Sequence, residues 1–248
     1  MSPAPLSETI VLITGANQGL GYECVKKLAL EQPNYRIIIG SRDLSKGQAA
    51  ASSVTKVAKN TSIEAVQLDV TSDESINAAV SYVENKYERL DVLFNNAGIM
   101  FVNESSPRVE FRTILETNTI GAACVTEAFV PLLSKAACPR LLFMSSGMGS
   151  MTLTTLPCSP FYGYDFKAYS TSKAGVNMIG LMYAKQLRKS GFKVNLVDPG
   201  FRQTNLNGFH SEGGDPAAGA TEACRLIADA SVDGQHGSFS ATEGLVPW

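Results

Sequence analysis

Tyr169 and Lys173, four residues apart, are the side chains of this sequence best suited to moving a proton. In a helix this spacing puts both side chains on one face. The ordinary pKa of a phenol is about 10, and a nearby ammonium group lowers it because the positive charge favours the phenolate. A fall of about three pKa units requires roughly 4 kcal/mol, so one exposed lysine needs help from a second cation or a dry pocket. The same spacing also fits a plain surface or packing pair.

The composition is that of an ordinary globular protein, with 248 residues of which 44% are hydrophobic and 18% charged. The 21 basic and 23 acidic side chains give a net charge of −2 without a dense basic tract, so we expect neither nucleic acid nor a membrane as a partner. Residues 1–8 lack the pattern of a secretory signal and no apolar run is long enough to span a bilayer, which predicts a cytoplasmic protein. The five cysteines are scattered without a C-x-x-C pair, which predicts reduced, mostly buried thiols and no metal site.

Short apolar runs rich in β-branched residues alternate with longer helical patterns along the chain. Such runs are typical of strands buried on both faces, and their alternation with helices predicts right-handed crossovers and a parallel sheet. We expect strands at 10–14, 36–40, 64–68, 92–94, 140–144 and 194–197, and helices near 19–31, 45–58, 73–88, 109–135, 167–190 and 217–229. Because no linker divides the chain, we predict one domain over 1–248. Its expected fold is α/β, a doubly wound Rossmann fold with a seven-stranded parallel sheet and helices on both faces.

A glycine-rich turn follows the first expected strand, with the sequence Thr14-Gly15-Ala16-Asn17-Gln18-Gly19-Leu20-Gly21. Its three glycines allow a tight turn, bring backbone N–H groups against a pyrophosphate at the helix N-terminus, and let helix and strand pack closely. Between a first strand and an amphipathic helix, this turn predicts dinucleotide binding, although glycines also occur in plain loops.

The second strand ends in Gly40-Ser41-Arg42-Asp43, without the terminal acid that binds the ribose 2′-hydroxyl of NAD. A guanidinium group there can pair with a 2′-phosphate through charge-assisted bonds of about 1.5–3 kcal/mol each. Arg42 therefore favours NADP over NAD by roughly tenfold or more. The alternative is that Arg42 caps a surface turn together with Asp43.

Two further strand ends carry residues suited to the same ligand. Asp69-Val70 ends the third strand, where a short acid can accept a hydrogen bond from an adenine amino group; a helix N-cap is the alternative. Asn95-Asn96-Ala97-Gly98 ends the fourth strand, at the sheet edge where this fold binds ligands. In the long helix expected at 109–135, the weak helix formers Thr117, Asn118 and Thr119 predict a kink or an exposed polar patch.

With these motifs the chain resembles the short-chain dehydrogenases/reductases over nearly its whole length. The resemblance extends to carbonyl-reductase-like members through Ser41-Arg42-Asp43 and the ending Val246-Pro247-Trp248. The motifs occur in the family's order: Thr14-Gly15-x-x-x-Gly19-x-Gly21, Asp69-Val70, Asn95-Asn96-Ala97-Gly98, Asn118, Ser145-Ser146, Tyr169-x-x-x-Lys173 and Pro199-Gly200.

This resemblance implies an NADPH-dependent reductase of a ketone or aldehyde. Ser146 would polarise the carbonyl, Tyr169 would protonate it, Lys173 would hold the ribose and tune Tyr169, and Asn118 would bind a relay water. The residues implied in binding NADP(H) are Gly15, Asn17, Gln18, Gly19, Leu20, Gly21, Ser41, Arg42, Asp69, Val70, Asn96, Ala97, Gly98, Tyr169, Lys173, Pro199, Gly200 and Thr204. Imine reduction, alcohol oxidation and a catalytically silent NADP-binding regulator stay open. A hydrolase is disfavoured, because the two histidines lie in late loops and no Gly-x-Ser-x-Gly elbow is present.

Two loops should flank the substrate. Ser146 precedes Tyr169 by 23 residues, where the family commonly has about 13, so 147–168 holds about ten extra residues. This loop is rich in aromatic and methionine residues, and 201–216 reads as a mobile lid with a Gly213-Gly214 hinge. Both favour a bulky, apolar, multi-ring carbonyl substrate, although 147–168 would also fit a subunit contact. The apolar load of 167–190 further predicts a homodimer or homotetramer.

Overall fold

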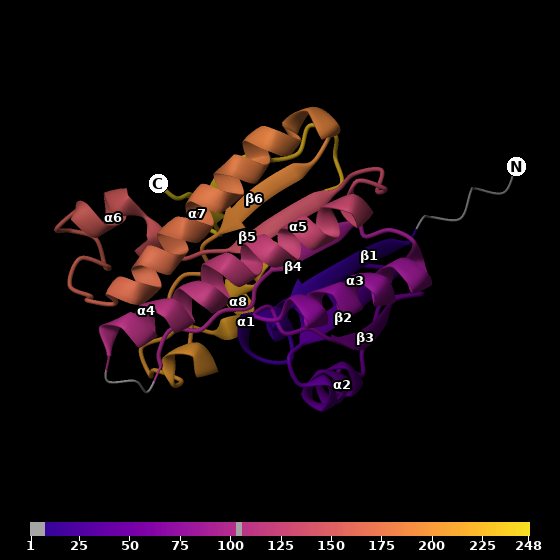
Figure 1. The fold of residues 1–248 in the computed structure, drawn as a ribbon, viewed down its shortest axis with the longest axis horizontal. Helices are drawn as coiled ribbons and strands as arrows, with labels where there is room; N and C mark the ends of the chain where they lie inside the picture. Colours follow the sequence, from indigo (N-terminus) through magenta and orange to yellow (C-terminus); the bar gives the residue numbers. More distant parts are fainter. Residues whose placement is uncertain (1–7, 103–105) are drawn as a thin grey trace, which may run out of the picture.

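Residues 8–102 and 106–248, which the computed structural model describes, form one sheet of eight strands in the order β3-β2-β1-β4-β5-β6-β7-β8 (Figure 1). The strands are β1 (Thr9–Thr14), β2 (Tyr35–Ser41), β3 (Ser62–Gln67), β4 (Val92–Asn95), β5 (Arg140–Met144), β6 (Lys193–Val197), β7 (Ser238–Ala241) and β8 (Gly244–Leu245). The first seven are parallel, and β8 pairs antiparallel with β7. The predicted doubly wound fold with seven parallel strands is therefore confirmed, and β8 is an additional edge strand. The expected absence of a leader falls largely on residues 1–7, outside the described residues.

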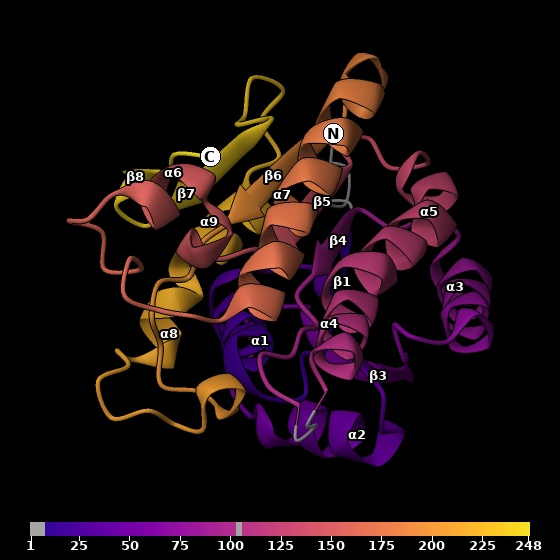
Figure 2. The same cartoon turned by 60° about the vertical axis from the view of Figure 1, so that its left-hand side comes forward.

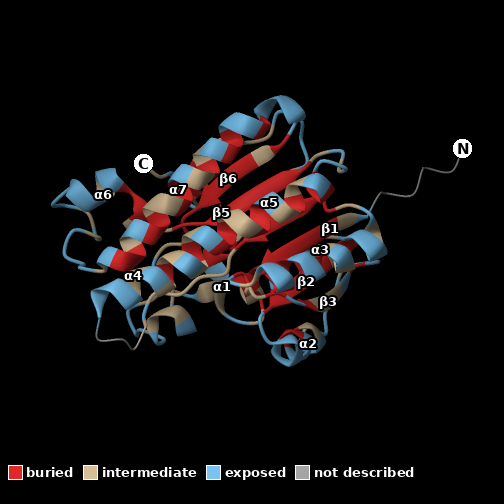
Figure 3. Cartoon of the chain, viewed as in Figure 1, coloured by how far each residue is buried: buried red, intermediate tan, exposed pale blue. Residues whose placement is uncertain are grey.

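Helices cover both faces of the sheet (Figures 1 and 2). They are α1 (Gly19–Glu31), α2 (Leu44–Ser53), α3 (Asp73–Tyr87), α4 (Pro107–Leu115), α5 (Gly121–Leu133), α6 (Met151–Thr155), α7 (Lys167–Leu187), α8 (Pro216–Gly219) and α9 (Thr221–Ala228). Buried residues of α3, α5 and α7 form one core with the sheet, and those of α1, α2 and α9 form a second core on its other face. Successive strand residues alternate between these cores: Leu12 joins the first, and Val11 and Ile13 join the second. This double burial explains the continuous apolar runs of the strands (Figure 3).

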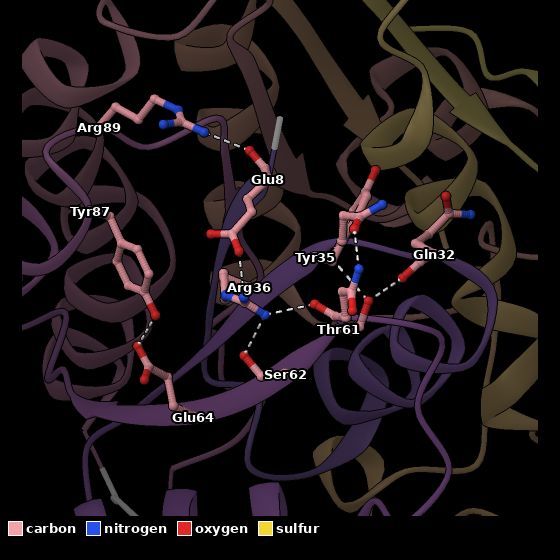
Figure 4. A network of polar contacts seen from close by, with 11 residues as sticks. Glu8, Gln32, Tyr35, Arg36, Thr61, Ser62, Glu64, Tyr87 and Arg89 are labelled. Atoms are coloured by element: carbon pink, nitrogen blue, oxygen red, sulfur yellow. Dashed lines mark hydrogen bonds and ion pairs between the residues drawn. The ribbon is translucent and has the colours of Figure 1, made fainter. Parts of the chain in front are cut away.

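The amino ends of the strands are tied together by charged side chains (Figure 4). Arg36 at the start of β2 pairs with Glu8 and donates to the carbonyl of Asn60 at 2.7 Å. Arg89 donates to the Glu8 carbonyl at 2.6 Å, and Asp91 Oδ2 accepts from the Ile10 N–H at 2.7 Å. This network lies at the amino ends of the strands. A ligand site is expected at the opposite edge of the sheet, where β1, β4, β5 and β6 all end.

The structure corrects several expected elements. The helix expected to reach residue 58 ends at Ser53, because Val54 turns into extended backbone. The helix expected at 109–135 is interrupted by a π-helix, Glu116–Ile120, between α4 and α5. The short strand β7 and the helix α6 were not located from the sequence. Two of the five cysteines are buried and Cys158 is exposed, so the thiols are less buried than expected; all five are free. Among the described residues, no helix is both long and apolar enough to cross a membrane.

Candidate active site

A cavity of about 1210 Å³ lies at the carboxyl edge of the sheet. Predicted site residues in its wall are Gly15, Asn17, Gln18, Gly19, Leu20, Arg42, Asp69, Val70, Asn96, Ala97, Gly98, Tyr169, Lys173, Pro199 and Thr204. Five other predicted residues lie outside the wall: Gly21, Ser41, Asn118, Ser146 and Gly200. Parallel strands end at the same edge, so residues more than 180 positions apart in sequence meet around one space.

The glycine turn fits closely against the end of β4. Gly15 has a φ of 64°, and a Cβ on it would come within 2.9 Å of the Ala97 backbone. A Cβ on Gly21 would lie 2.4 Å from the Asn96 amide. That amide donates to the Thr14 carbonyl at 2.8 Å, and the Thr14 hydroxyl accepts from the N–H groups of Asn96 and Ala97. Only glycine allows this approach, which leaves a backbone-lined cradle of the kind a pyrophosphate occupies.

Arg42 lines the cavity and is exposed, and no described acidic group forms an ion pair with it. The alternative turn cap with Asp43 is not formed, because the Asp43 carboxylate accepts from the Ser45 and Lys46 N–H groups at the start of α2. The Ser45 hydroxyl also donates to this carboxylate and contributes most to holding the pKa of Asp43 below its ordinary value. The two N–H groups lower that pKa further. Ser41 is buried outside the cavity wall, and its hydroxyl proton is donated to the Asp43 carbonyl at 2.7 Å.

Asp69 takes the cavity position and not the alternative role of helix cap. The N-cap of α3 is Ser72, whose side chain accepts from the Ser75 N–H. Asp69 Oδ1 accepts from the N–H of Thr71 at 3.0 Å and from its hydroxyl at 2.7 Å. A second oxygen of this carboxylate remains for a ligand donor.

Asn118 lies at the centre of the π-helix, a local irregularity in the segment where the weak helix formers predicted one, and it is not part of an exposed polar patch. It is only 1% exposed. Its Oδ1 accepts from the Ile99 N–H at 2.8 Å, and its Nδ2 donates to the Ile99 carbonyl and to the Ser172 hydroxyl, both at 2.9 Å. A Cβ on Gly98 would lie 3.3 Å from Asn118 Oδ1 and 3.5 Å from Lys173 Nζ. The π-helix thus joins the turn after β4 to the helix that carries Tyr169 and Lys173.

Tyr169 and Lys173 are neighbours on α7, and both are buried. Lys173 Nζ lies 5.6 Å from the centroid of the Tyr169 ring and donates to the Met144 carbonyl at 2.8 Å. Burial raises the pKa of Tyr169 well above its ordinary value, while the Ser146 hydroxyl lowers it and the charge of Asp198 raises it. Burial also lowers the pKa of Lys173 to about 8. In the cofactor-free chain burial therefore favours the protonated phenol, so a lowered phenol pKa would require the second cation that the sequence also suggested.

The two serines after β5 point in different directions. The Ser145 hydroxyl is buried and donates to Asn177 Oδ1 on α7. The Ser146 hydroxyl accepts from the Met148 N–H at 3.2 Å and lies close enough to the Tyr169 phenol to lower its pKa. A carbonyl oxygen between Ser146 and Tyr169 would meet two hydroxyl donors, and the arrangement can therefore polarise and protonate such an oxygen.

The loop 147–168 carries aromatic rings that pack against one another and against the turns after β4 and β5. Phe166 packs edge-to-face with Phe101 from the turn after β4, with 5.5 Å between centroids, and stacks with Tyr164 at 5.8 Å. Phe161 covers Gly147, where a Cβ would come within 2.4 Å of the ring. The backbone N–H of Thr152 on α6 donates to the carbonyl of Trp248 at 3.0 Å, which anchors the loop to the end of the chain.

The glycine pair in 201–216 has a packing role that the hinge interpretation missed. Gly214 exchanges backbone hydrogen bonds with Phe201 and Gln203, and a Cβ on Gly213 would lie 2.5 Å from the Gln203 nitrogen. Thr204 is buried and lines the cavity at the end of this closed loop. The sequence also missed Arg108 and Arg112 of α4, which line the cavity. Their four-residue spacing was visible, but the face that α4 turns to the site was not.

These features are those of an oxidoreductase with a dinucleotide cradle. The chain belongs to the short chain dehydrogenase family, whose family model matches residues 9–213. The predicted family and the resemblance to carbonyl reductases are thereby confirmed. Members of this family bind NAD or NADP. Among the described residues, no three His, Cys, Asp or Glu side chains gather as a metal site would require.

Relatives match the chain nearly from end to end. Short-chain dehydrogenase anuI of Penicillium roqueforti (strain FM164) is 35% identical over 240 residues, which cover 93% of this chain and 91% of that protein. Carbonyl reductase (NADPH) 1 of Sus scrofa is 26% identical and covers 96% of this chain and 94% of its own length. The solved structure of NADPH-bound carbonyl reductase from chicken fatty liver is 26% identical, with a TM-score of 0.79 over 98% of this chain and 100% of that chain.

Proposed function

We propose that the chain, as a single catalytic domain, is an NADPH-dependent reductase of bulky apolar ketones or aldehydes. The observation that carries this proposal is the meeting of the Ser146 hydroxyl, the Tyr169 phenol and the Lys173 ammonium group beside a glycine cradle. The relatives named carbonyl reductase support the same substrate class.

The residues of the cavity fit an NADPH molecule, which would supply a hydride to the carbonyl carbon. The cradle of Gly15, Gly19 and Gly21 would hold the pyrophosphate, Arg42 the 2′-phosphate, and Asp69 the adenine amino group. Thr204 and the Pro199-Gly200 turn would meet the carboxamide end, and Asn96, Ala97 and Gly98 would line the middle.

The chain's own side chains would handle the proton. Ser146 donates a hydrogen bond to the substrate oxygen, and Tyr169 gives it a proton as negative charge develops there. A phenol whose pKa is raised by burial stays protonated at neutral pH, which suits the acid of a reduction. Lys173 holds the ribose. Asn118 fixes the turn after β4, from which a relay water would reach Lys173.

NADPH consumption by the purified chain with a panel of aromatic and alicyclic ketones tests this function. Silence across a wide panel, combined with tight NADPH binding, would favour the second candidate, a catalytically silent regulator. Imine substrates and the reverse oxidation of alcohols with NADP⁺ belong in the same panel, because they use the same proton and hydride geometry.

Arg42→Ala should raise the KM for NADPH by about 10–100-fold and leave the KM for NADH within about twofold, because one or two charge-assisted bonds to the 2′-phosphate are lost. Steady-state kinetics with both cofactors measures this. Lys46→Ala is the matched control, since Lys46 is a nearby exposed cation outside the cavity wall. Equal changes in both KM values would remove Arg42 from the phosphate site.

Catalytic efficiency should rise steeply from small aliphatic ketones to multi-ring ones, because Phe101, Tyr164 and Phe166 offer aromatic contacts of about 0.5–1.5 kcal/mol each. Shortening 151–160 removes α6 and its bond to Trp248, and should erase most of this preference. The kcat/KM for a small ketone serves as the internal control and should stay within about threefold. Comparable efficiency on small and multi-ring carbonyls in the unaltered enzyme would make the loop structural.

A homodimer or homotetramer formed through α7 is also part of the proposal. Met178 and Met182 on this helix are 56% and 54% exposed, and Ile120 on the π-helix is 47% exposed. Exposed apolar groups on neighbouring helices favour association. Light scattering should give at least twice the 26.5 kDa mass of one chain, and a monomer mass at micromolar concentration would contradict the proposal.

A further inference from the structure

Asp198, the residue that follows β6, is a buried acid beside the proposed reacting groups. It is only 9% exposed. Its backbone N–H donates to the Ser240 carbonyl on β7 at 2.9 Å, which fixes the residue in the sheet. Its side chain therefore has little freedom to move toward solvent.

The Asp198 carboxylate connects the turns that follow two neighbouring strands. Oδ1 accepts from the Gly200 N–H at 3.0 Å, within the turn after β6. Oδ2 lies 3.0 Å from the position of a Cβ on Gly147, and the Gly147 N–H is close enough to the carboxylate to lower its pKa. Gly147 belongs to the turn after β5 and directly follows Ser146. The same acid thus reaches both the serine turn and the Pro199-Gly200 turn.

The sheet itself does not hold Ser146 in place. The last backbone hydrogen bond between β5 and β6 runs from the Ser145 N–H to the Val197 carbonyl at 2.8 Å, one residue before Ser146. Beyond it, the Asp198 side chain continues the connection between the two strands. On the other side of Gly147 lies the ring of Phe161, so the turn is held between an acid and an aromatic ring.

We propose that Asp198 is a positioning residue, whose carboxylate holds the turn of Ser146 so that its hydroxyl meets the Tyr169 phenol. The proposal rests on the proposed function in assigning that meeting point to the substrate carbonyl. A group displaced by about 1 Å at such a centre can cost roughly 100-fold in rate, which is the scale on which a turn must be fixed.

The charge of Asp198 has a second effect on the same centre. The groups that act on the Tyr169 pKa are the Ser146 hydroxyl after β5 and the charge of Asp198 after β6, and Lys173 Nζ on α7 lies 5.6 Å from the ring centroid. Burial raises the pKa of Asp198 itself, the charge of Glu243 raises it further and that of Arg202 lowers it. A negative charge near a phenol disfavours the phenolate, and Asp198 accordingly raises the pKa of Tyr169. Asp198 therefore helps to keep the proposed acid protonated.

The test compares Asp198→Ala, Asp198→Asn and the control Glu243→Gln, which removes an exposed charge that raises the pKa of Asp198. The alanine variant should lose about 10–100-fold in kcat and raise the NADPH KM by a smaller factor, because the Gly200 N–H in the cofactor-binding turn also loses its acceptor. The asparagine variant should regain most of that kcat, because its amide oxygen still accepts a backbone hydrogen bond. Its reduction rate should fall off at a lower pH than that of the wild type, since the phenol pKa drops when the charge is removed. Glu243→Gln should change neither kcat nor the pH at which the reduction rate falls off.

Titration of Tyr169 by NMR of ¹³C-labelled tyrosine, assigned with Tyr169→Phe, separates this proposal from the proposed function. If the wild type reduced no carbonyl, the proposed function would fail, yet Asp198→Asn should still lower the Tyr169 pKa. An unchanged Tyr169 titration, or an unchanged kcat in Asp198→Ala, would overturn the role of Asp198. A parallel loss of NADPH affinity in both variants would also overturn it, because that pattern reports a general structural role.

Discussion

Tyr169→Phe should lower kcat for carbonyl reduction by about 10²–10⁴-fold, the usual contribution of a positioned general acid. The substitution removes only the hydroxyl, and the buried ring keeps its packing and its 5.6 Å distance from Lys173 Nζ. Ser146 would still donate a hydrogen bond to the carbonyl oxygen, but the phenol that supplies the proton would be absent. The NADPH KM should stay within about threefold, because the phenol acts mainly on the substrate. Single-turnover rates with NADPH measure the chemical step directly.

Tyr164→Phe is the matched control for this variant, since it removes one phenol from the same part of the chain. Tyr164 is exposed and stacks on Phe166, away from Lys173. Its hydroxyl has no part in the proposed reaction, and the change should leave kcat within about twofold. If Tyr169→Phe kept most of the turnover, the proton would come from another group and the mechanism proposed for this site would be wrong.

The positions of the candidate site were predictable because they lie at strand ends. In a parallel doubly wound sheet, residues just beyond successive strands meet at one edge, so motifs such as Gly15 to Gly21 and Asn96 to Gly98 converge without knowledge of side-chain packing. Asn118 was indicated for a different reason, since weak helix formers in mid-helix mark a local irregularity. In each case a motif of a few residues was enough to predict where its side chains lie in the folded chain.

The environment of those residues was not predictable in the same way. The pKa of Tyr169 depends on how many atoms bury it, and that burial is contributed by segments far away in sequence. The role of Asp198 depends on a turn that precedes it by about fifty residues and on the register between β5 and β6. The cavity-facing side chains of α4 depend on the rotation of that helix. These quantities follow from three-dimensional packing and leave no local pattern.

Lys173 shows how such burial links stability to function. Its ammonium group is almost fully buried, and its pKa falls from the ordinary 10.5 to about 8 because desolvation disfavours the charged form. This gap corresponds to roughly 3 kcal/mol of free energy that the folded chain loses by keeping the lysine charged. The hydrogen bond to the Met144 carbonyl offsets part of this cost, by about 0.5–1.5 kcal/mol. A group that destabilises the fold and is buried at the candidate site is typical of a functional residue.

Lys173→Met should therefore abolish most activity, by about 10²–10⁴-fold, and yet make the cofactor-free protein more stable than the wild type at pH 7. The sign of the pH dependence follows from the proton count. Between about pH 8 and pH 10.5 the folded wild type has released the lysine proton and the unfolded chain has not, so wild-type stability rises with pH. The variant lacks this titration, and its advantage of roughly 1–3 kcal/mol should shrink to less than about 1 kcal/mol by pH 10.

Urea unfolding of both proteins at pH 7 to 10 measures this difference, and Lys185→Met is the matched control. Lys185 lies on the same helix but is exposed, so its removal should shift stability by less than about 0.5 kcal/mol at every pH. A wild type and a Lys173→Met variant whose free energies of unfolding change in parallel would show that the lysine is not titrating near pH 8. Burial of the lysine would then not lower the free energy of unfolding. The support for its catalytic role would come from the kinetics of Lys173→Met alone.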